Sequence, residues 1–186
     1  PGARDVEAEP MHIRPANIGD LERCARIEAS FRSEYVWQME ERETPEGRDI
    51  SFRRVRVPRP VEVRYCPGEE ELIADLQRNE CFLVADHLGV ILGYLDMTVR
   101  RGPWLGWIEH LVVHPAYRRQ HVATRLLEAA EHWARGSELR AIIIPVQTKN
   151  DPALCLLTRR GYSFCGFMDR YYDGSELGLL YALRLG

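Results

Sequence analysis

Two consecutive arginines stand where an apolar segment gives way to a helical pattern. The segment VVHPAYRRQHVATRLLEAAEHWARG (112–136) places Arg118 and Arg119 just ahead of apolar residues at helical spacing. That spacing predicts a helix that begins near His121 and ends at Gly136. A helix start carries unpaired N–H groups and partial positive charge, so two cations there conflict electrostatically unless an anion binds among them. A phosphate or pyrophosphate would remove the conflict; arginines that point into screening water are the alternative.

The elements that must position these arginines are predicted from periodicity and turn signals. One helix is expected from a cap at Asn17 or Asp20 to about Ser30. The remaining helices are expected at 67–79, 122–136 and 150–161, and strands at 12–15, 81–100 (two strands with a turn at 86–89), 107–113, 139–146, 162–172 and 177–185. The pattern indicates an α+β fold with a largely antiparallel run of strands.

The segment between the first two helices is less regular. Residues 31–49 are polar and contain the breakers Pro45 and Gly47. Residues 51–65 alternate like a strand but are interrupted by Pro58 and Pro60, which predicts an edge or lid hairpin. Six arginines in or near this alternating stretch could attract an acidic ligand, although a solvated strand face is the interpretation we favour; they are Arg48, Arg53, Arg54, Arg56, Arg59 and Arg64.

Length and composition predict one globular domain, residues 11–186, after a polar leader, residues 1–10, that we expect to be disordered. The net charge of −3 favours no nucleic-acid partner, and no apolar run is long enough to cross a bilayer. The five cysteines are odd in number and form no C-x-x-C pair, so reduced thiols and a cytoplasmic location are expected, with no metal site.

Two motifs resemble the signatures of the GNAT N-acetyltransferase superfamily. After IEHLVV, the pattern V-x-x-x-Y-R-R-Q-H-V-A-T-x-L-L resembles the coenzyme signature Arg/Gln-x-x-Gly-x-Gly/Ala, with Arg118 in the first position and Ala123 in the last. The segment NDPALCLLTRRGY resembles the second signature, Asn-x-x-Ala followed by Gly-Phe. The resemblance covers Ile13 to Leu185, and WIEHLVV, QTKNDPA and FCGFMDRYY look most like the branch with streptothricin acetyltransferases.

This resemblance implies a GNAT-type mixed, mostly antiparallel central sheet flanked by helices. It also implies a coenzyme cleft between two splayed parallel strands, here 107–113 and 139–146. The cosubstrate would be acetyl-coenzyme A, and a primary amine would attack its thioester directly. The residues implied in coenzyme binding are Leu111, Val112, Val113, Arg118, Arg119, Gln120, His121, Val122, Ala123, Thr124, Asn150 and Ala153.

The sequence departs from the family pattern at two positions. His121 stands where a glycine usually lets the backbone approach the pyrophosphate, so weaker coenzyme binding is expected. Leu157 stands where many members carry the tyrosine that protonates the departing thiolate, a function that Tyr162, Tyr171 or Tyr172 could take over. Glu109 is the predicted general base, because apolar strand neighbours should partly desolvate its carboxylate.

These observations support an acetyl-coenzyme A–dependent N-acetyltransferase that acts on the amine of a small molecule, such as an antibiotic. One alternative is a protein N-terminal or lysine acetyltransferase. A second is a coenzyme-binding module without catalysis, which His121 and Leu157 suggest. The protein is expected to be a monomer or a homodimer, and acceptor pockets are built from variable loops such as 31–65. In a regular strand His110 would point away from Glu109, so only one of the two should face the cleft.

Overall fold

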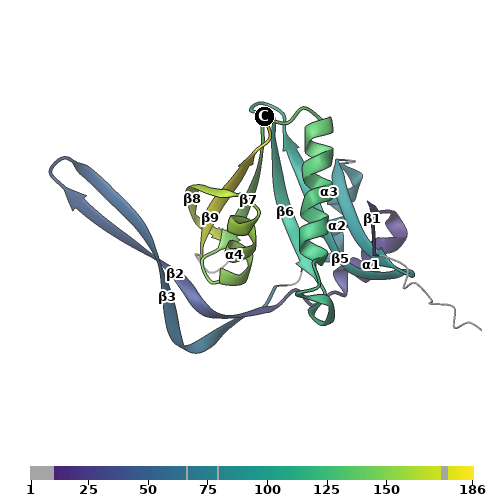
Figure 1. Cartoon of the computed structure of the whole chain (residues 1–186), viewed down its shortest axis with the longest axis horizontal. Coiled ribbons are helices and arrows are strands. Elements are labelled where there is room, and N and C mark those ends of the chain that lie inside the picture. Colours follow the sequence, from purple (N-terminus) through teal and green to yellow (C-terminus); the bar gives the residue numbers. More distant parts are fainter. Residues whose placement is uncertain (1–10, 66, 79, 173–175) are drawn as a thin grey trace, which may run out of the picture.

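The computed structural model describes residues 11–65, 67–78, 80–172 and 176–186. A seven-stranded sheet forms the body in the order β1-β4-β5-β6-β7-β9-β8, and β2 and β3 form a separate two-stranded arm (Figure 1). The leader predicted at 1–10 lies outside the described residues. No helix in the described ranges has the length and apolar character to cross a membrane.

The sheet is antiparallel at every junction except that between β6 and β7, which run parallel. This confirms the predicted mixed, mostly antiparallel architecture. Its strands are β1 (His12–Pro15), β4 (Cys81–His87), β5 (Val90–Arg100), β6 (Leu105–Val113), β7 (Ala141–Gln147), β8 (Ser163–Tyr172) and β9 (Glu176–Arg184).

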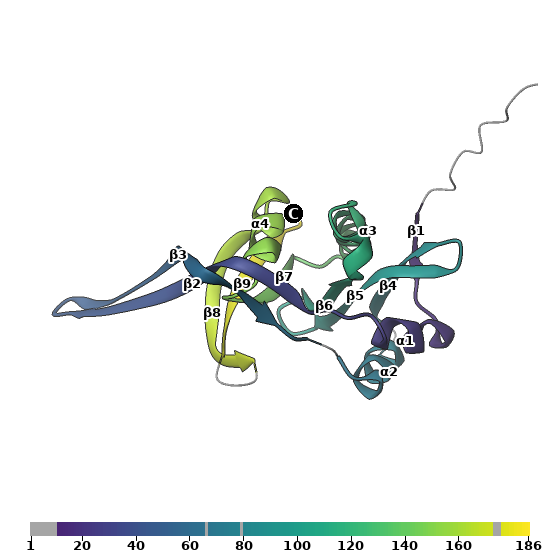
Figure 2. The same ribbon diagram turned by 90° about the horizontal axis from the view of Figure 1, so that it is seen from below.

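Helices cover both faces of the sheet. Figure 2 shows α3 and α4 on one side and α1 and α2 on the other. The helices are α1 (Ile18–Ala25), α2 (Glu69–Gln77), α3 (Val122–Gly136) and α4 (Asp151–Arg159), with a 3₁₀ turn at Pro115–Tyr117. Two apolar cores result, and β5 contributes to both: Leu95 packs under α3, while Tyr94 packs toward α1 and α2. Burial on both faces explains why β5 reads as an almost continuous apolar run.

Helix α1 begins as predicted but ends early. The Asn17 side chain accepts a hydrogen bond from the backbone of Gly19, and the Asp20 carboxylate accepts one from the Asn17 N–H. This reciprocal pair satisfies the free N–H groups of the first turn. The helix stops at Ala25 rather than near Ser30 because the Ile27 N–H bonds to the Cys24 carbonyl, a tight turn that leads the chain toward the arm.

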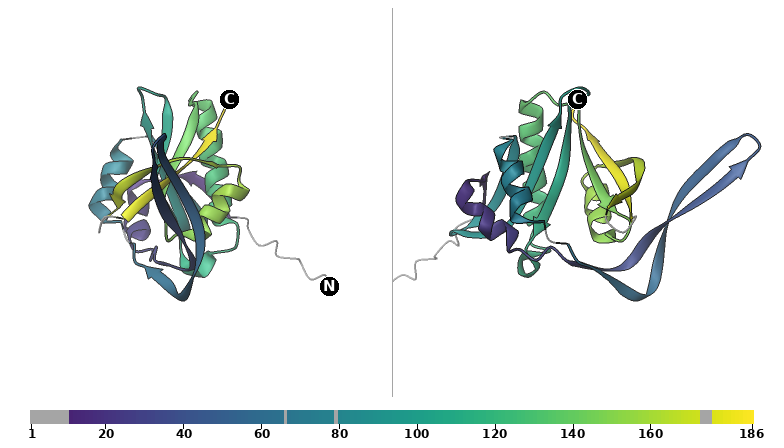
Figure 3. Two further views of the ribbon diagram at one scale, coloured as in Figure 1. Left: turned by 90° about the vertical axis from the view of Figure 1, so that its left-hand side faces the viewer. Right: turned by 180° about the vertical axis from the view of Figure 1, so that it is seen from behind.

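The arm is longer than the sequence predicts. It consists of β2 (Phe31–Thr44) and β3 (Gly47–Val63), so the hairpin predicted within 51–65 instead pairs the polar segment 31–44 with 47–63. Its polar composition reflects exposure, since the arm stands away from the body (Figure 3). Both prolines fall in 57–60, a stretch of β3 without partners in β2, where a missing N–H costs no ladder bond.

Three arm arginines, Arg48, Arg53 and Arg56, form exposed cross-strand ion pairs, as the solvated-face interpretation predicts. Arg48 pairs with Glu43 at 2.7 Å, and Arg53 pairs with Glu40. Arg54 differs, because its guanidinium reaches the body of the protein and binds the buried Asp151 carboxylate with two hydrogen bonds of 2.7 and 2.8 Å.

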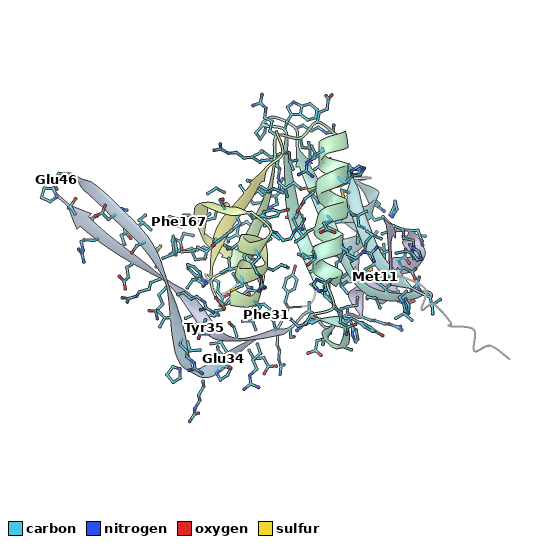
Figure 4. All side chains as sticks on the ribbon, viewed as in Figure 1. Met11, Phe31, Glu34, Tyr35, Glu46 and Phe167 are labelled. Atoms are coloured by element: carbon cyan, nitrogen blue, oxygen red, sulfur yellow. The ribbon has the colours of Figure 1, made fainter. Side chains whose placement is uncertain are left out.

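Three contacts fasten the inner half of the arm to the body. The Arg54–Asp151 ion pair ties it to the start of α4. The backbone N–H of Trp37 donates to the carbonyl of Thr148, just after β7, at 2.8 Å. Phe52 packs edge-on against Phe167 of β8, which Figure 4 places beside the arm. The base of the arm is therefore held close to the place where β7 meets α4.

Candidate active site

Strands β6 and β7 pair only at their beginnings. The ladder comprises Leu105–Ala141, Gly106–Ile142 and Trp107–Ile143, and it ends there. Beyond this point the strands separate around a cavity of about 120 Å³. The separation confirms the predicted cleft, and it leaves the β7-side edge of β6 free to bind an extended ligand through its backbone.

Both strands, the base of the arm and α4 contribute to the walls of this cavity. Its lining residues are Ala29, Phe31, Tyr65, Ile108, Glu109, His110, Leu111, Val112, Ile144, Pro145, Val146, Gln147, Asn150, Ala153, Leu156, Leu157 and Tyr172. Figure 4 shows Phe31 at the base of the arm, with Glu46 at the far tip. The cavity therefore unites Glu109 with four residues predicted for coenzyme binding, namely Leu111, Val112, Asn150 and Ala153.

A β-bulge interrupts β6 at the site. His110 pairs with Asp96 of β5 and Ile108 pairs with Met97, so Glu109 is one residue extra. The Thr98 hydroxyl donates to the Glu109 carboxylate at 2.8 Å. Because Asp96 and Thr98 are two residues apart and share one face of β5, Glu109 and His110 also share a face. The expectation that only one of the pair faces the cleft was wrong, since both line the cavity.

Glu109 is partly desolvated and held by two donors. Its side chain is 23% exposed, and besides Thr98 it accepts a hydrogen bond from the Arg100 guanidinium at 3.2 Å. Thr98 is buried at the back of this pair. The carboxylate is therefore oriented by these donors, and its cavity-facing surface can still meet a substrate.

His110 lies at the centre of a buried polar cluster that the sequence analysis missed. Its Nδ1 contacts the Tyr65 hydroxyl, and its Nε2 lies 3.4 Å from a Glu71 oxygen and 3.6 Å from an Asp75 oxygen. Burial lowers the pKa of His110, against the opposing effect of these carboxylates. Tyr65 follows the arm and Asp75 lies on α2, so spacing along the chain offered no signal that they meet.

Asp96 completes this cluster from β5. It is 2% exposed, and neither of its carboxylate oxygens has a hydrogen-bond donor among the described residues. Burial, followed by the neighbouring Asp75, raises its pKa well above the ordinary value. The ligand atoms of Asp75, Asp96 and His110 lie within 4.8 Å of one another, so either a proton or a metal ion could join them.

Of the three tyrosines predicted to act on the thiolate, one lies in the cavity; Tyr162 lies outside its lining, buried in the core. Tyr172 lines it, and burial raises the pKa of its hydroxyl, so the group stays protonated. Tyr171 lies outside the lining, where its hydroxyl accepts a hydrogen bond from Trp107 Nε1 at 3.1 Å. Leu157 is buried in the core beneath the cavity and supplies no donor there.

The start of α3 has the features of an anion site. No side chain caps its first turn. That turn also contains no acidic residue, whereas the first turns of α1, α2 and α4 each contain at least one. The backbone enters the helix through a left-handed conformation at Arg119 (φ 63°) and His121 (φ 62°). Glycine adopts a left-handed conformation without a steric penalty, which explains why the family signature has glycine at the position of His121.

The predicted phosphate-binding side chains differ in their placement. The Arg118 guanidinium donates to the carbonyls of Val113 at 3.1 Å and Glu28 at 3.3 Å, and burial lowers its pKa. The Gln120 side chain donates to the Ala116 carbonyl. Arg119 and His121 are exposed. Arg118 therefore braces the end of β6 in this structure, and Arg119 is the arginine that remains open to an anion.

Asn150 links the cleft to α4. Its Oδ1 accepts a hydrogen bond from the Ala153 N–H at 3.2 Å and caps the helix, as the sequence predicts. Its amide NH₂ group is not used by that bond. Since Asn150 also lines the cavity, this NH₂ group can serve a ligand there.

The one parallel junction of the sheet opens into a cleft, and the start of α3 beside it is suited to bind phosphates. This combination defines an acetyltransferase of the coenzyme A–dependent type. The model of the Acetyltransferase (GNAT) family matches residues 33–162, and the chain belongs to that family. It is therefore an acetyltransferase whose cosubstrate is acetyl-coenzyme A.

Two curated relatives show how acceptors vary among similar sequences. Streptothricin acetyltransferase of Streptomyces lavendulae is 23% identical over 169 residues, which cover 88% of this chain and 87% of the relative. N-alpha-acetyltransferase RimI of Mycobacterium tuberculosis is 26% identical over 170 residues, which cover 90% and 87%. The two names designate a small-molecule and a protein acetyltransferase.

Solved structures agree on the fold. Nourseothricin acetyltransferase superposes with a TM-score of 0.81 at 22% identity, over 95% of this chain and 99% of its own. A candidate streptothricin acetyltransferase from Bacillus anthracis, crystallised with acetyl coenzyme A, gives 0.75 at 20% identity, over 96% and 99%. At these identities the likeness confirms the GNAT architecture.

Proposed function

We propose that this protein transfers the acetyl group of acetyl-coenzyme A to the primary amine of a small molecule by direct attack. The observation that carries the proposal is the cavity where β6 and β7 separate, with the Glu109 carboxylate in its wall. A cavity of about 120 Å³, lined by Phe31 and Tyr65 among others, suits a slender aminoalkyl group better than a folded polypeptide.

The donor half follows from the backbone. The free edge of β6 at Leu111–Val113 pairs with the pantetheine arm and polarises the thioester carbonyl. The first-turn N–H groups of Val122 to Thr124, together with Arg119, bind the pyrophosphate. The Asn150 amide binds the pantetheine chain from the opposite wall. Arg118, Gln120 and His121 shape the loop, and Ala153 keeps the start of α4 close to the coenzyme.

The acceptor half follows from Glu109. An alkyl amine is mostly protonated at neutral pH and must lose a proton before it can attack. Glu109, oriented by Thr98 and Arg100, accepts that proton directly or through one water. A tyrosine in the cavity, Tyr65 or Tyr172, then supplies a proton to the departing thiolate. Tyr171, bonded to Trp107, supports Tyr172 by edge-on ring packing.

The test is thiol release from acetyl-coenzyme A with a panel of amines: a streptothricin, polyamines, amino-acid amides and peptides with free N-termini. We expect turnover with one or more small amines. Turnover with peptides alone would instead favour protein N-terminal acetylation, the alternative that the likeness to RimI raises. Coenzyme binding without turnover of any amine would identify a non-catalytic module.

A further inference from the structure

The buried cluster behind the cavity has the composition of a proton supply. Four polar atoms of Asp75, Asp96 and His110 have no hydrogen-bond partner among the described residues, and all three side chains are more than nine-tenths buried. A buried carboxylate without a donor is costly, so such a group takes up a proton or a cation. A proton shared by Asp75 and Asp96 satisfies both groups.

Resting on the proposed function, we propose that Tyr65, His110 and the Asp75–Asp96 pair form a proton relay that protonates the coenzyme A thiolate. The relay would replace the tyrosine that many family members carry at the position of Leu157. Tyr65 is the catalytic residue, since its hydroxyl lies in the cavity wall. His110, Asp75 and Asp96 are positioning residues that act through it. Tyr172 borders the same cavity, where its ring packs edge-on against Tyr171.

The direction of transfer follows from the groups. Burial and nearby carboxylates raise the pKa of Tyr65, so its hydroxyl is a donor rather than a base. As the C–S bond breaks, the thiolate takes the Tyr65 proton. The His110 Nδ1–H returns a proton to the Tyr65 oxygen, and Nε2 takes the proton that Asp75 and Asp96 share. Tyr65 and His110 each lose one proton and gain one. The Asp75–Asp96 pair is left without its shared proton, and the thiol is the product.

The relay can be recharged from water. Glu71 is 57% exposed and lies 3.4 Å from His110 Nε2, so it connects the buried pair to solvent. The ammonium gives one proton to Glu109, which passes it to water, and after attack the nitrogen gives its second proton to Glu109. The relay returns one proton from water to the thiolate, so one turnover releases one net proton. The groups that face His110 are Tyr65 beyond β3, Glu71 and Asp75 of α2, Asp96 of β5 and Glu109 of β6. Arg78 binds the other Asp75 oxygen at 2.6 Å and keeps the shared proton on the His110 side.

The first experiment compares Tyr65→Phe with Tyr172→Phe and with Tyr35→Phe, a control on the arm outside the cavity lining. We expect Tyr65→Phe to lower kcat by about 10²-fold, at the lower end of general acid–base effects because a thiolate leaves readily. The KM for acetyl-coenzyme A should not change. Tyr35→Phe should match the wild type. A larger loss for Tyr172→Phe than for Tyr65→Phe would overturn the assignment of Tyr65.

The second experiment tests the supply behind Tyr65. Asp96→Asn and His110→Gln should each lower kcat about tenfold at pH 6.5. The ratio of the wild-type kcat to the Asp96→Asn kcat should approach one as rising pH removes the shared proton. Because titration of the amine affects both enzymes equally, it does not change this ratio. A ratio that does not vary with pH would show that Asp96 is only structural. Melting temperatures within a few degrees of the wild type exclude unfolding as the cause.

Two measurements test whether the proton relay exists even when no amine is turned over. The ¹⁵N NMR signals of His110 should show the Nδ1–H tautomer in the wild type and a different ring state in Asp96→Asn. An Nε2–H tautomer in the wild type would contradict the relay. Zn²⁺ and Mn²⁺ titrations by calorimetry should give no tight binding. Stoichiometric binding that Asp96→Asn abolishes would mean that a metal ion, not a proton, occupies the cluster.

Discussion

Glu109 and His110 are adjacent in β6, yet their side chains lie on the same face of the sheet. Glu109 bonds to Thr98 and His110 pairs with Asp96, two residues that share a face of β5. The bulge that causes this brings a carboxylate and an imidazole to one cavity, beside the point where β6 leaves β7. Bulges are frequent next to active sites because they redirect one side chain without unfolding the strand.

Acetyl-coenzyme A should stabilise the protein. A ligand that binds only the native state adds about 2.7 kcal/mol at a concentration 100 times its Kd, or roughly 5–10 °C in Tm for a chain of this size. Thermal unfolding with and without the coenzyme measures this, and adenosine is the control ligand without a pyrophosphate. No shift at millimolar coenzyme, together with no heat in calorimetry, would remove the donor site from the proposal.

His121→Gly should raise stability and keep or tighten coenzyme binding at pH 8. The backbone of His121 is left-handed, a conformation that costs a residue with a Cβ about 1 kcal/mol. Glycine removes this strain and opens the phosphate loop, so Tm should rise by roughly 2–4 °C.

The matched control is Leu88→Gly, an exposed left-handed residue in the β4–β5 turn and outside the 118–121 loop. It should raise Tm similarly without changing coenzyme affinity. A large loss of coenzyme affinity in His121→Gly would instead show that the imidazole binds the phosphates. Titration at pH 6, where a ligand histidine gains charge, would then show tighter wild-type binding.

Glu109→Gln should lower kcat by about 10²–10⁴-fold with little change in coenzyme affinity, because the amide keeps the shape but cannot accept the proton. The rate should recover partly at high pH, where more of the amine is neutral. Steady-state kinetics across pH measure this, with the exposed Glu22→Gln as the control. Wild-type turnover with an unchanged pH profile would exclude Glu109 as the base.

Asp151→Asn should lower Tm by a few degrees and loosen the base of the arm. The Arg54 guanidinium is the main cause of the lowered pKa of Asp151, so the pair stabilises the fold while the carboxylate is ionised. A folded-state pKa below the unfolded value of about 3.9 contributes stability above that pH and loses it as pH falls through the folded value.

The difference in Tm between the wild type and Asp151→Asn should therefore be largest near pH 6 and shrink below about pH 4. Asp169→Asn, at an exposed position on β8, is the matched control and should leave Tm unchanged. Because the arm base carries Phe31 and Tyr65 into the cavity wall, the KM for the amine should also rise in Asp151→Asn. Equal Tm values at all pH values would mean that the ion pair does not anchor the arm.

The sequence by itself determined the family and most elements of the fold. Helical spacing from Val122, the cap at Asn150 and the buried run 139–146 are local patterns, and local patterns follow from neighbouring residues alone. Two signatures also predicted the coenzyme cleft, because they mark the backbone that approaches the phosphates.

Only the tertiary structure decided what surrounds the reacting atoms. The β6 bulge depends on pairing with β5, and pairing partners are not encoded in the local period of one strand. The long arm escaped prediction because an exposed ribbon needs no apolar alternation. Tyr65, Asp75, Asp96 and His110 meet from four separate elements, so the cluster exists only once packing removes water from between them. That desolvation, rather than any motif, raises the pKa of Asp96 and Tyr65 and lowers the pKa of His110.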